Sequence, residues 1–300
     1  MQTIKDEIRQ LKKDKNAIIL AHYYQTSDIL EIADMIGDSY ALSKKAKENN
    51  ADVIVFCGVR FMAESAKILS PEKKVLLPVF NAGCPMADMI MPQDVERLRH
   101  EYPDAAVVCY VNSSSEVKAQ SDVCVTSSNA VKVVRSLKEN RIIFIPDQNL
   151  ASYVASQVPE KEIIPFHGYC VVHHQVNADE VAEARAAVPD ALLLVHPECT
   201  PAVVNKADFV GSTAKIIDFA TRSDNKKFII GTEMGILHVL KKENPDKEFY
   251  LLSPKLFCTN MKKTRMDDLR DALKYDQHEI ILSQEIIEKA RKSLDRMLMF

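Results

Sequence analysis

The chain repeats itself at intervals of about 86 residues, and this period constrains its architecture more than any other feature. Segments 7–25, 94–113 and 179–198 each pass from a charged, helix-like stretch through a short apolar run into a polar loop. His22, Tyr110 and His196 stand at the same point of these segments, 88 and 86 residues apart. Self-similarity at a fixed spacing predicts three related structural units.

Two further sets of positions keep the same spacing. One set holds hydroxyl residues just before helical periodicity, where helix N-caps are expected, namely Ser39, Ser127 and Thr213. The other set holds cysteines that close the units, namely Cys84, Cys170 and Cys258. Three independent anchors therefore agree on the period.

The order of the elements predicts the fold class. Short β-branched strands that alternate with helices are typical of parallel β-α-β units with helices on both faces of the sheet. We expect an α/β protein with three homologous three-layer parallel-sheet domains, in a pseudo-threefold arrangement around a central active-site cavity. The predicted domains are 1–86, 87–172 and 173–264, and the helices of 265–300 are expected to pack back on the first and complete it.

Composition and motifs exclude several classes of function. The chain has 39 Lys and Arg against 42 Asp and Glu, and no segment concentrates the basic residues as a nucleic-acid surface requires. It has no apolar signal region and no run of about 18 apolar residues. We therefore expect a cytoplasmic protein that binds neither nucleic acid nor membrane. With seven glycines and neither GxGxxG nor GxxxxGK[ST], dinucleotide and P-loop sites are not supported.

The cysteines point to a metal site built from distant segments. Seven is an odd number, the chain has no export signal, and no two cysteines are three residues apart, which argues against disulfides and local metal motifs. Three equivalent thiolates favour an iron–sulfur cluster or zinc. The other cysteines are expected to fill the core or, in the case of Cys199, to stand beside the site, which leaves one metal position open: Cys57, Cys109, Cys124 and Cys199.

Residues at the ends of the strands are the candidates for binding and chemistry. In open parallel sheets, ligands bind beyond the carboxyl ends of the strands, where helix N-termini favour anions, so we predict a small anionic ligand. His196 and Glu198 offer an imidazole and a carboxylate for proton transfer. Tyr24 serves either in packing or as a phenolic donor. His173 and His174 are expected only to border the site.

Nine short motifs follow one another along the chain: AHYYQ, GDSYALS, AGCPMAD, CYVNSS, TSSNA, FHGYCVVH, VHPECT, DFVGSTAKI and GTEMGILH. Together they resemble the quinolinate synthases, iron–sulfur enzymes of NAD biosynthesis, over essentially the whole chain. The resemblance implies one 4Fe-4S cluster bound by Cys84, Cys170 and Cys258, with one iron that has no protein ligand and acts as a Lewis acid.

The resemblance also implies a reaction. A transferase-class condensation joins iminosuccinate to dihydroxyacetone phosphate and yields quinolinate, phosphate and two waters. The enzyme that oxidises L-aspartate is the implied functional partner, because it supplies iminosuccinate. The implied catalytic residues are Tyr24, Tyr110, His196 and Glu198. The implied substrate-binding residues are His22, Ser39, Tyr110, Asn112, Ser127, His196, Glu198, Ser212 and Thr213.

Two alternatives use the same cysteines. An iron–sulfur sensor would exchange its cluster with the cell, but the chain has no basic recognition helix. A zinc-dependent hydrolase would use three cysteines and water, but the usual histidine-rich ligation is missing. The metal content of an anaerobic preparation distinguishes the zinc-dependent hydrolase from a protein that holds an iron–sulfur cluster.

Overall fold

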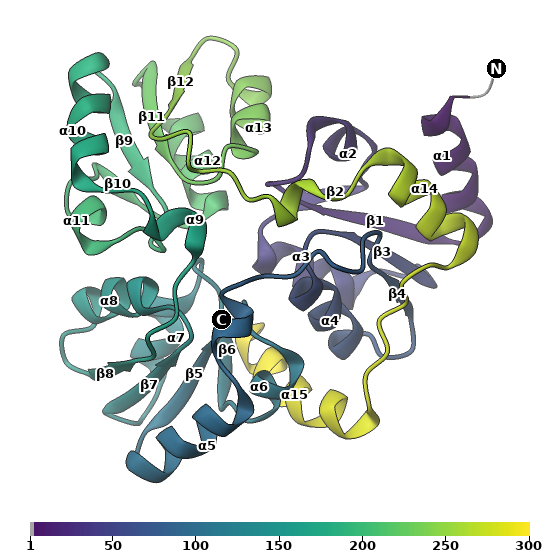
Figure 1. Cartoon of the computed structure of the whole chain (residues 1–300), viewed down its shortest axis with the longest axis horizontal. Helices are drawn as coiled ribbons and strands as arrows, with labels where there is room; N and C mark the ends of the chain where they lie inside the picture. Colours follow the sequence, from purple (N-terminus) through teal and green to yellow (C-terminus); the bar gives the residue numbers. More distant parts are fainter. Residues whose placement is uncertain (1–2) are drawn as a thin grey trace.

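The computed structural model describes residues 3–300 and has three lobes around a common centre (Figure 1). Each lobe is built on a four-stranded parallel sheet with surrounding helices. The predicted fold class, an α/β protein with three homologous parallel-sheet domains, is therefore confirmed. The boundaries expected at 86/87, 172/173 and 264/265 stay predictions.

The three sheets have the same strand order. In each, the first strand of the unit lies between the second and the third, and the fourth pairs with the third. The first sheet comprises β1 (Ala17–His22), β2 (Met35–Gly37), β3 (Val53–Cys57) and β4 (Lys74–Leu76). The second comprises β5 (Ala106–Tyr110), β6 (Val123–Val125), β7 (Arg141–Ile145) and β8 (Glu162–Pro165). The third comprises β9 (Leu192–Val195), β10 (Phe209–Val210), β11 (Lys227–Gly231) and β12 (Glu248–Leu251).

One helix precedes each strand. The first unit contains α1 (Ile4–Asp14), α2 (Ser27–Ile32), α3 (Ser39–Glu48) and α4 (Arg60–Leu69). The second contains α5 (Pro92–Glu101), α6 (Ser115–Ala119), α7 (Ala130–Ser136) and α8 (Gln148–Gln157). The third contains α10 (Ala178–Ala187), α11 (Pro201–Val204), α12 (Thr213–Arg222) and α13 (Ile236–Glu243). No helix within residues 3–300 is long and apolar enough to cross a bilayer.

Strand pairing repeats with the spacing of the sequence. Ala21 pairs with Cys57 in the first sheet, and Cys109 pairs with Ile145 in the second. Val195 pairs with Gly231 in the third. Because these partners are separated by the same 88 and 86 residues as the sequence anchors, the strands end at equivalent points in each unit. Their carboxyl ends present equivalent loops to the centre.

Alternation along the strands creates a three-layer unit. In β1, Ile19 packs in a cluster with residues of α1 and α2, whereas Leu20 packs with residues of α3 and α4. The same alternation holds in β9, where Leu193 joins α10 and α11 and Leu194 joins α12 and α13. Both faces of each sheet are buried, which is why the strands are continuous apolar runs.

The predicted N-caps are wrong by one or more positions. The caps of α3 and α12 are Asp38 and Ser212, whose side chains accept hydrogen bonds from backbone N–H groups of the first turn. Ser39 and Thr213 are consequently the first helical residues. Ser127 lies in the turn before Asn129, the residue that precedes α7. In α3 and α12 the preceding polar residue has the extended backbone conformation of a cap, so the predicted hydroxyl residue is not the cap. Asn129 makes no side-chain capping hydrogen bond.

The C-terminal helices join two units. Helix α14 (Met266–Tyr275) packs on α1 and β3 of the first unit. Helix α15 (Gln284–Met297) packs on α4 of the first unit but also on α6 and β6 of the second (Figure 1). Residues 265–300 were expected to pack on the first domain, and α14 does so. Helix α15 instead contacts two domains through its apolar face.

We expect Leu294→Ala to destabilise the whole chain. Leu294 in α15 is fully buried in the cluster that joins the first two units, and truncation of such a leucine costs about 2–5 kcal/mol. Urea unfolding followed by circular dichroism should show a lower midpoint. Met299→Ala, at a position 78% exposed, is the matched control, and equal midpoints for the two variants would contradict the bridging role of α15.

Candidate active site

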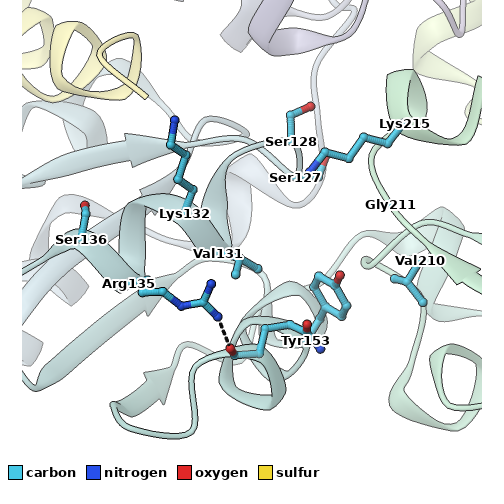
Figure 2. Close-up of a pocket in the computed structure, with 11 residues that line it drawn as sticks. Ser127, Ser128, Val131, Lys132, Arg135, Ser136, Tyr153, Val210, Gly211 and Lys215 are labelled. Carbon is cyan, nitrogen blue, oxygen red and sulfur yellow. Dashed lines mark hydrogen bonds between the residues drawn. The ribbon is translucent and has the colours of Figure 1, made fainter. Parts of the chain in front are cut away.

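Two adjoining cavities occupy the centre of the molecule. The cysteine cavity has a volume of 70 Å³ and is lined by Cys84, Cys170 and Cys258. The polar cavity has a volume of 50 Å³ and is lined by residues at the strand ends, among them His22, Ser39, Tyr110, Ser127, His196 and Thr213. Four residues line both cavities and form the wall between them: Tyr24, Asn112, Glu198 and Met261. A third, larger groove opens on the outer side of Ser127 (Figure 2).

Each unit contributes one cysteine to the cysteine cavity. Cys84, Cys170 and Cys258 are half-buried, and burial raises the pKa of all three thiols, that of Cys84 to about 12. The remaining four cysteines are fully buried, and three of them, Cys57, Cys109 and Cys124, were expected in the core. Cys199 lies with its Sγ 3.5 Å from the Gly231 carbonyl oxygen and does not line the cavity. The thiols that can reach a ligand are thus the three equivalent ones.

Short helical segments follow the three cysteines, namely η1 (Ala87–Met89), α9 (Val171–His174) and η2 (Asn260–Lys262). Two of the cysteine loops are held by buried carboxylates. Asp147 Oδ2 accepts the Cys170 N–H at 3.1 Å, and Glu233 Oε1 accepts the Cys258 N–H at 3.1 Å. The equivalent residue of the first unit is Val59, so the Cys84 loop has no such anchor. The three loops are equivalent in position but not in how they are held.

His22 and His196 share one backbone arrangement. The Nδ1 atom of His22 accepts the Tyr24 N–H at 3.2 Å, and Nδ1 of His196 accepts the Glu198 N–H at 3.3 Å. Burial lowers the pKa of His22 to about 3 and that of His196 to about 4, so both imidazoles are neutral near pH 7. With Nδ1 as acceptor, each ring carries its proton on Nε2. His196 directs this proton to Ser127 Oγ, 3.1 Å away, which leaves the Ser127 hydroxyl hydrogen free for a ligand.

A chain of hydrogen bonds connects Tyr24 to Glu198. The Tyr24 hydroxyl lies 2.7 Å from Thr232 Oγ1 and 2.8 Å from Thr213 Oγ1. Thr232 Oγ1 lies 2.9 Å from His173 Nε2, and His173 Nδ1 lies 2.8 Å from Glu198 Oε2. A hydroxyl, an imidazole and a carboxylate in this sequence can pass a proton between Tyr24 and Glu198.

Glu198 is the charged centre of this arrangement. Burial acts to raise its pKa, but the neighbouring His196 and His173 side chains outweigh burial and lower the pKa to about 2. The group is therefore a carboxylate, and its Oε1 atom is buried without a hydrogen-bond partner. Burial, followed by the charge of Glu198, raises the pKa of Tyr110 well above its ordinary value, so this phenol keeps its proton.

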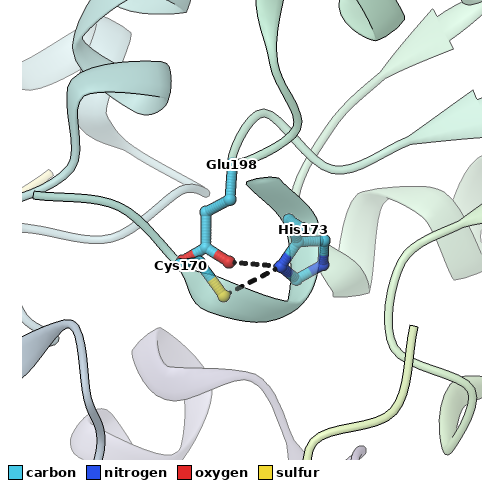
Figure 3. Close-up of side chains that lie close together, drawn as sticks. All are labelled: Cys170, His173 and Glu198. Atoms are coloured by element: carbon cyan, nitrogen blue, oxygen red, sulfur yellow. Dashed lines mark hydrogen bonds and ion pairs between the residues drawn. The ribbon is translucent and has the colours of Figure 1, made fainter. Parts of the chain in front are cut away.

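Cys170, His173 and Glu198 form a group that could hold a metal ion (Figure 3). Their candidate ligand atoms lie within 4.8 Å of one another, and His173 Nδ1 lies 3.2 Å from Cys170 Sγ. The two other cavity cysteines supply further thiols to the same space. Soft sulfur ligands grouped in this way suit iron–sulfur clusters and zinc rather than hard cations.

A lysine connects the third cysteine loop to the first unit. Lys262 Nζ lies 3.0 Å from the Glu233 carboxylate and also donates to the backbone oxygen of Tyr24. Gly235 permits this close approach, because a Cβ atom at this position would lie 2.7 Å from Tyr24 Cα. The Tyr24 backbone is thereby fixed against the loop that carries Cys258.

All but one of the site residues selected from the sequence line the two cavities, and several residues of the site were not selected. Ser212 is fully buried outside them, where its hydroxyl lies 2.8 Å from Ser128 Oγ. His173 was expected only to border the site, yet it touches Cys170 and Glu198. Thr232, Asp147, Glu233 and Lys262 were not selected. The available signal was positional, since Asp147 and Glu233 are 86 residues apart and each follows a strand end.

Comparison with known proteins identifies the family. Residues 6–299 match the family model described as NadA, quinolinate synthetase A protein. A quinolinate synthase of Alkaliphilus metalliredigens is 61% identical over 98% of this chain and 97% of its own. The quinolinate synthase of Caldicellulosiruptor saccharolyticus is 59% identical over 99% of this chain and 98% of its own. That of Clostridioides difficile is 53% identical over 97% of this chain and 96% of its own. The chain belongs to the quinolinate synthetase A family and is an enzyme, which confirms the resemblance noted in its motifs.

We expect Asp147→Ala to loosen the Cys170 loop. Asp147 is fully buried and accepts the N–H groups of Leu150 and Cys170, and a buried N–H left without an acceptor costs about 1–3 kcal/mol. Hydrogen exchange at Cys170 should accelerate, and the free energy of unfolding should fall. The exposed Asp190→Ala variant is the control. Unchanged exchange at Cys170 would show that the carboxylate does not anchor the loop.

Proposed function

We propose that this chain is a quinolinate synthase, which condenses iminosuccinate with dihydroxyacetone phosphate to give quinolinate, phosphate and two waters. The full-length family match and the identities above 50% carry the proposal. They favour it over the iron–sulfur sensor and the zinc-dependent hydrolase. The enzyme that oxidises L-aspartate remains the expected functional partner, because its product is the substrate iminosuccinate.

The cysteine cavity fits the cofactor of this reaction. Three thiols from three units, with the partnerless Glu198 Oε1 on the same wall, form a sulfur-rich donor set. We infer that Cys84, Cys170 and Cys258 hold one 4Fe-4S cluster. When bound, such a cluster supplies a Lewis-acidic iron that can polarise an oxygen atom of the substrate.

The polar cavity supports binding of a dicarboxylate. The hydroxyls of Ser39, Ser127 and Thr213 line it, and neutral His22 can offer its Nε2 proton to a carboxylate oxygen. His196 donates its Nε2 proton to Ser127 and so leaves the Ser127 hydroxyl hydrogen free for the ligand. Hydrogen bonds to a charged ligand contribute about 1.5–3 kcal/mol each. Asn112 and the protonated Tyr110 complete the set of donors. Ser212 contributes through the backbone of the turn that carries Thr213 rather than through its own hydroxyl.

Glu198 and Tyr24 are the proposed proton-transfer groups. Carbon–carbon bond formation requires removal of a proton from the carbon beside the imine, and an ionised carboxylate can accept it. Burial raises the pKa of Tyr24 well above its ordinary value, so its phenol keeps a proton that it can donate to a leaving hydroxyl. His173 and Thr232 connect the two groups, so a proton taken at one end can be returned at the other. The enclosed cavity keeps water from the hydrolysable imine.

Product formation tests the proposed reaction. Protein prepared and assayed without oxygen should form quinolinate and phosphate from iminosuccinate and dihydroxyacetone phosphate. Glu198→Gln should lower kcat by about 100-fold or more, because the isosteric amide cannot accept the proton. Glu183→Gln, at an exposed carboxylate of α10, should retain the activity of the unchanged protein. A loaded wild-type protein that forms no quinolinate would overturn the proposal.

Metal content tests the proposed ligands. Cys84→Ser, Cys170→Ser and Cys258→Ser should each lose most of the iron and acid-labile sulfide, together with the visible absorption of the cluster. Cys199→Ser is the matched control, since this thiol lies beside Glu198 in sequence but outside the cavity. Loss of iron from the control with retention in Cys170→Ser would contradict the assignment. Zinc as the sole metal would favour the hydrolase.

A further inference from the structure

The groove on the outer side of Ser127 has a volume of 490 Å³ and lies between the second and third units (Figure 2). We call it the Lys215 groove and define it by Ser127, Ser128, Arg135, Tyr153, Gly211 and Lys215. It is roughly ten times larger than the polar cavity, whose volume is 50 Å³. It can therefore hold a small organic molecule of the size that the polar cavity must receive.

The groove carries positive charge without a carboxylate in its lining. Its charged side chains are Lys132, Arg135 and Lys215, whereas the chain as a whole has a net charge of −3. Lys132 donates to the backbone oxygen of Phe300, and Figure 2 shows its amine directed away from the groove. Arg135 donates to the backbone oxygen of Gln157 at 2.6 Å and lies 3.8 Å from Glu160. The donors of these two side chains are therefore already engaged.

Lys215 is the cation that a ligand can reach. Within residues 3–300, its side chain has no hydrogen bond or ion pair, and it is exposed. In Figure 2 it extends from α12 toward Ser127 and Ser128. An exposed ammonium group beside two hydroxyls is a suitable partner for a phosphate or carboxylate group.

Ser127 connects the groove to the centre, because it lines both the groove and the polar cavity. The adjacent Ser128 hydroxyl lies 2.7 Å from Asp38 Oδ2 and 2.8 Å from Ser212 Oγ. These contacts join all three units at the floor of the groove. The two other large surface cavities, of 510 and 600 Å³, share no lining residue with the polar cavity.

We propose that the Lys215 groove is an anion-binding site that collects the phosphorylated substrate, a phosphate monoester, before it passes Ser127 into the polar cavity. The substrate class rests on the proposed function. The charge and position of the groove do not, since they follow from the lining residues alone. A cationic concave surface raises the local concentration of anions and the rate at which they associate, and this effect weakens with salt.

Charge reversal at Lys215 tests the site by kinetics. At low ionic strength, Lys215→Glu should lower kcat/KM for dihydroxyacetone phosphate at least about tenfold, more than it lowers kcat, and added salt should reduce the difference. Lys215→Arg should restore most of kcat/KM. Lys44→Glu, at an exposed lysine of α3 with the same change in net charge, is the matched control. Equal kcat/KM for the two Glu variants would overturn the proposal.

Chemical labelling tests the site without turnover. Pyridoxal 5′-phosphate forms an imine with a lysine amine and releases water, and borohydride reduces the imine to a stable amine that mass spectrometry locates. Lys215 should be labelled before Lys44, and inorganic phosphate should suppress this preference. Selective labelling in a protein that forms no quinolinate would support the anion-binding groove and overturn the proposed function. Quinolinate formation with no preferential labelling of Lys215 would support the proposed function and overturn the proposal for the groove.

Discussion

The chemistry of this protein depends on keeping one negative charge, that of Glu198, in an enclosed space. A buried carboxylate loses several kcal/mol of hydration unless nearby groups replace the lost water. Here the His173 imidazole of α9 replaces part of it, because its Nδ1 atom lies 2.8 Å from Glu198 Oε2. Burial also fixes the protonation states of the surrounding groups. It outweighs the charge of Glu198 and lowers the pKa of His22 and His196, which stay neutral, and it raises the pKa of Tyr110, which keeps its proton.

Threefold repetition supplies the positions, and departures from it supply the function. The cysteines are equivalent, and so are the turns at His22 and His196. The anchoring position, in contrast, holds Val59 in one unit and carboxylates in the other two. A perfectly symmetric centre would offer three identical faces to a ligand, whereas condensation of two different substrates needs distinct ones. The apolar Val59 and the ion pair of Glu233 with Lys262 make the faces different.

The period of the sequence was sufficient to predict the fold and the groups at the strand ends. Both are properties of local order, since each strand, helix and loop is read from adjacent residues, and parallel sheets bring their carboxyl ends together. The role of His173 was not predictable in this way, because its partners Glu198 and Thr232 lie in other loops. The contact of α15 with the second unit was not predictable for the same reason, because an apolar helix face does not indicate which surface packs against it. The predictions of the N-caps of α3 and α12 were wrong at a finer level, because two adjacent polar residues could each occupy the cap position.

The bridging position of α15 has a consequence for synthesis of the chain. Domains form as they leave the ribosome, from the N-terminus onward. The apolar surface between α4, α6 and β6 belongs to the first 125 residues, but the helix that covers it is translated after all three sheets. In the nascent chain, this apolar surface of the first and second units therefore stays exposed to water, or bound by a chaperone, until α15 has been translated. The interface between the first two units is complete only after α15 has been translated.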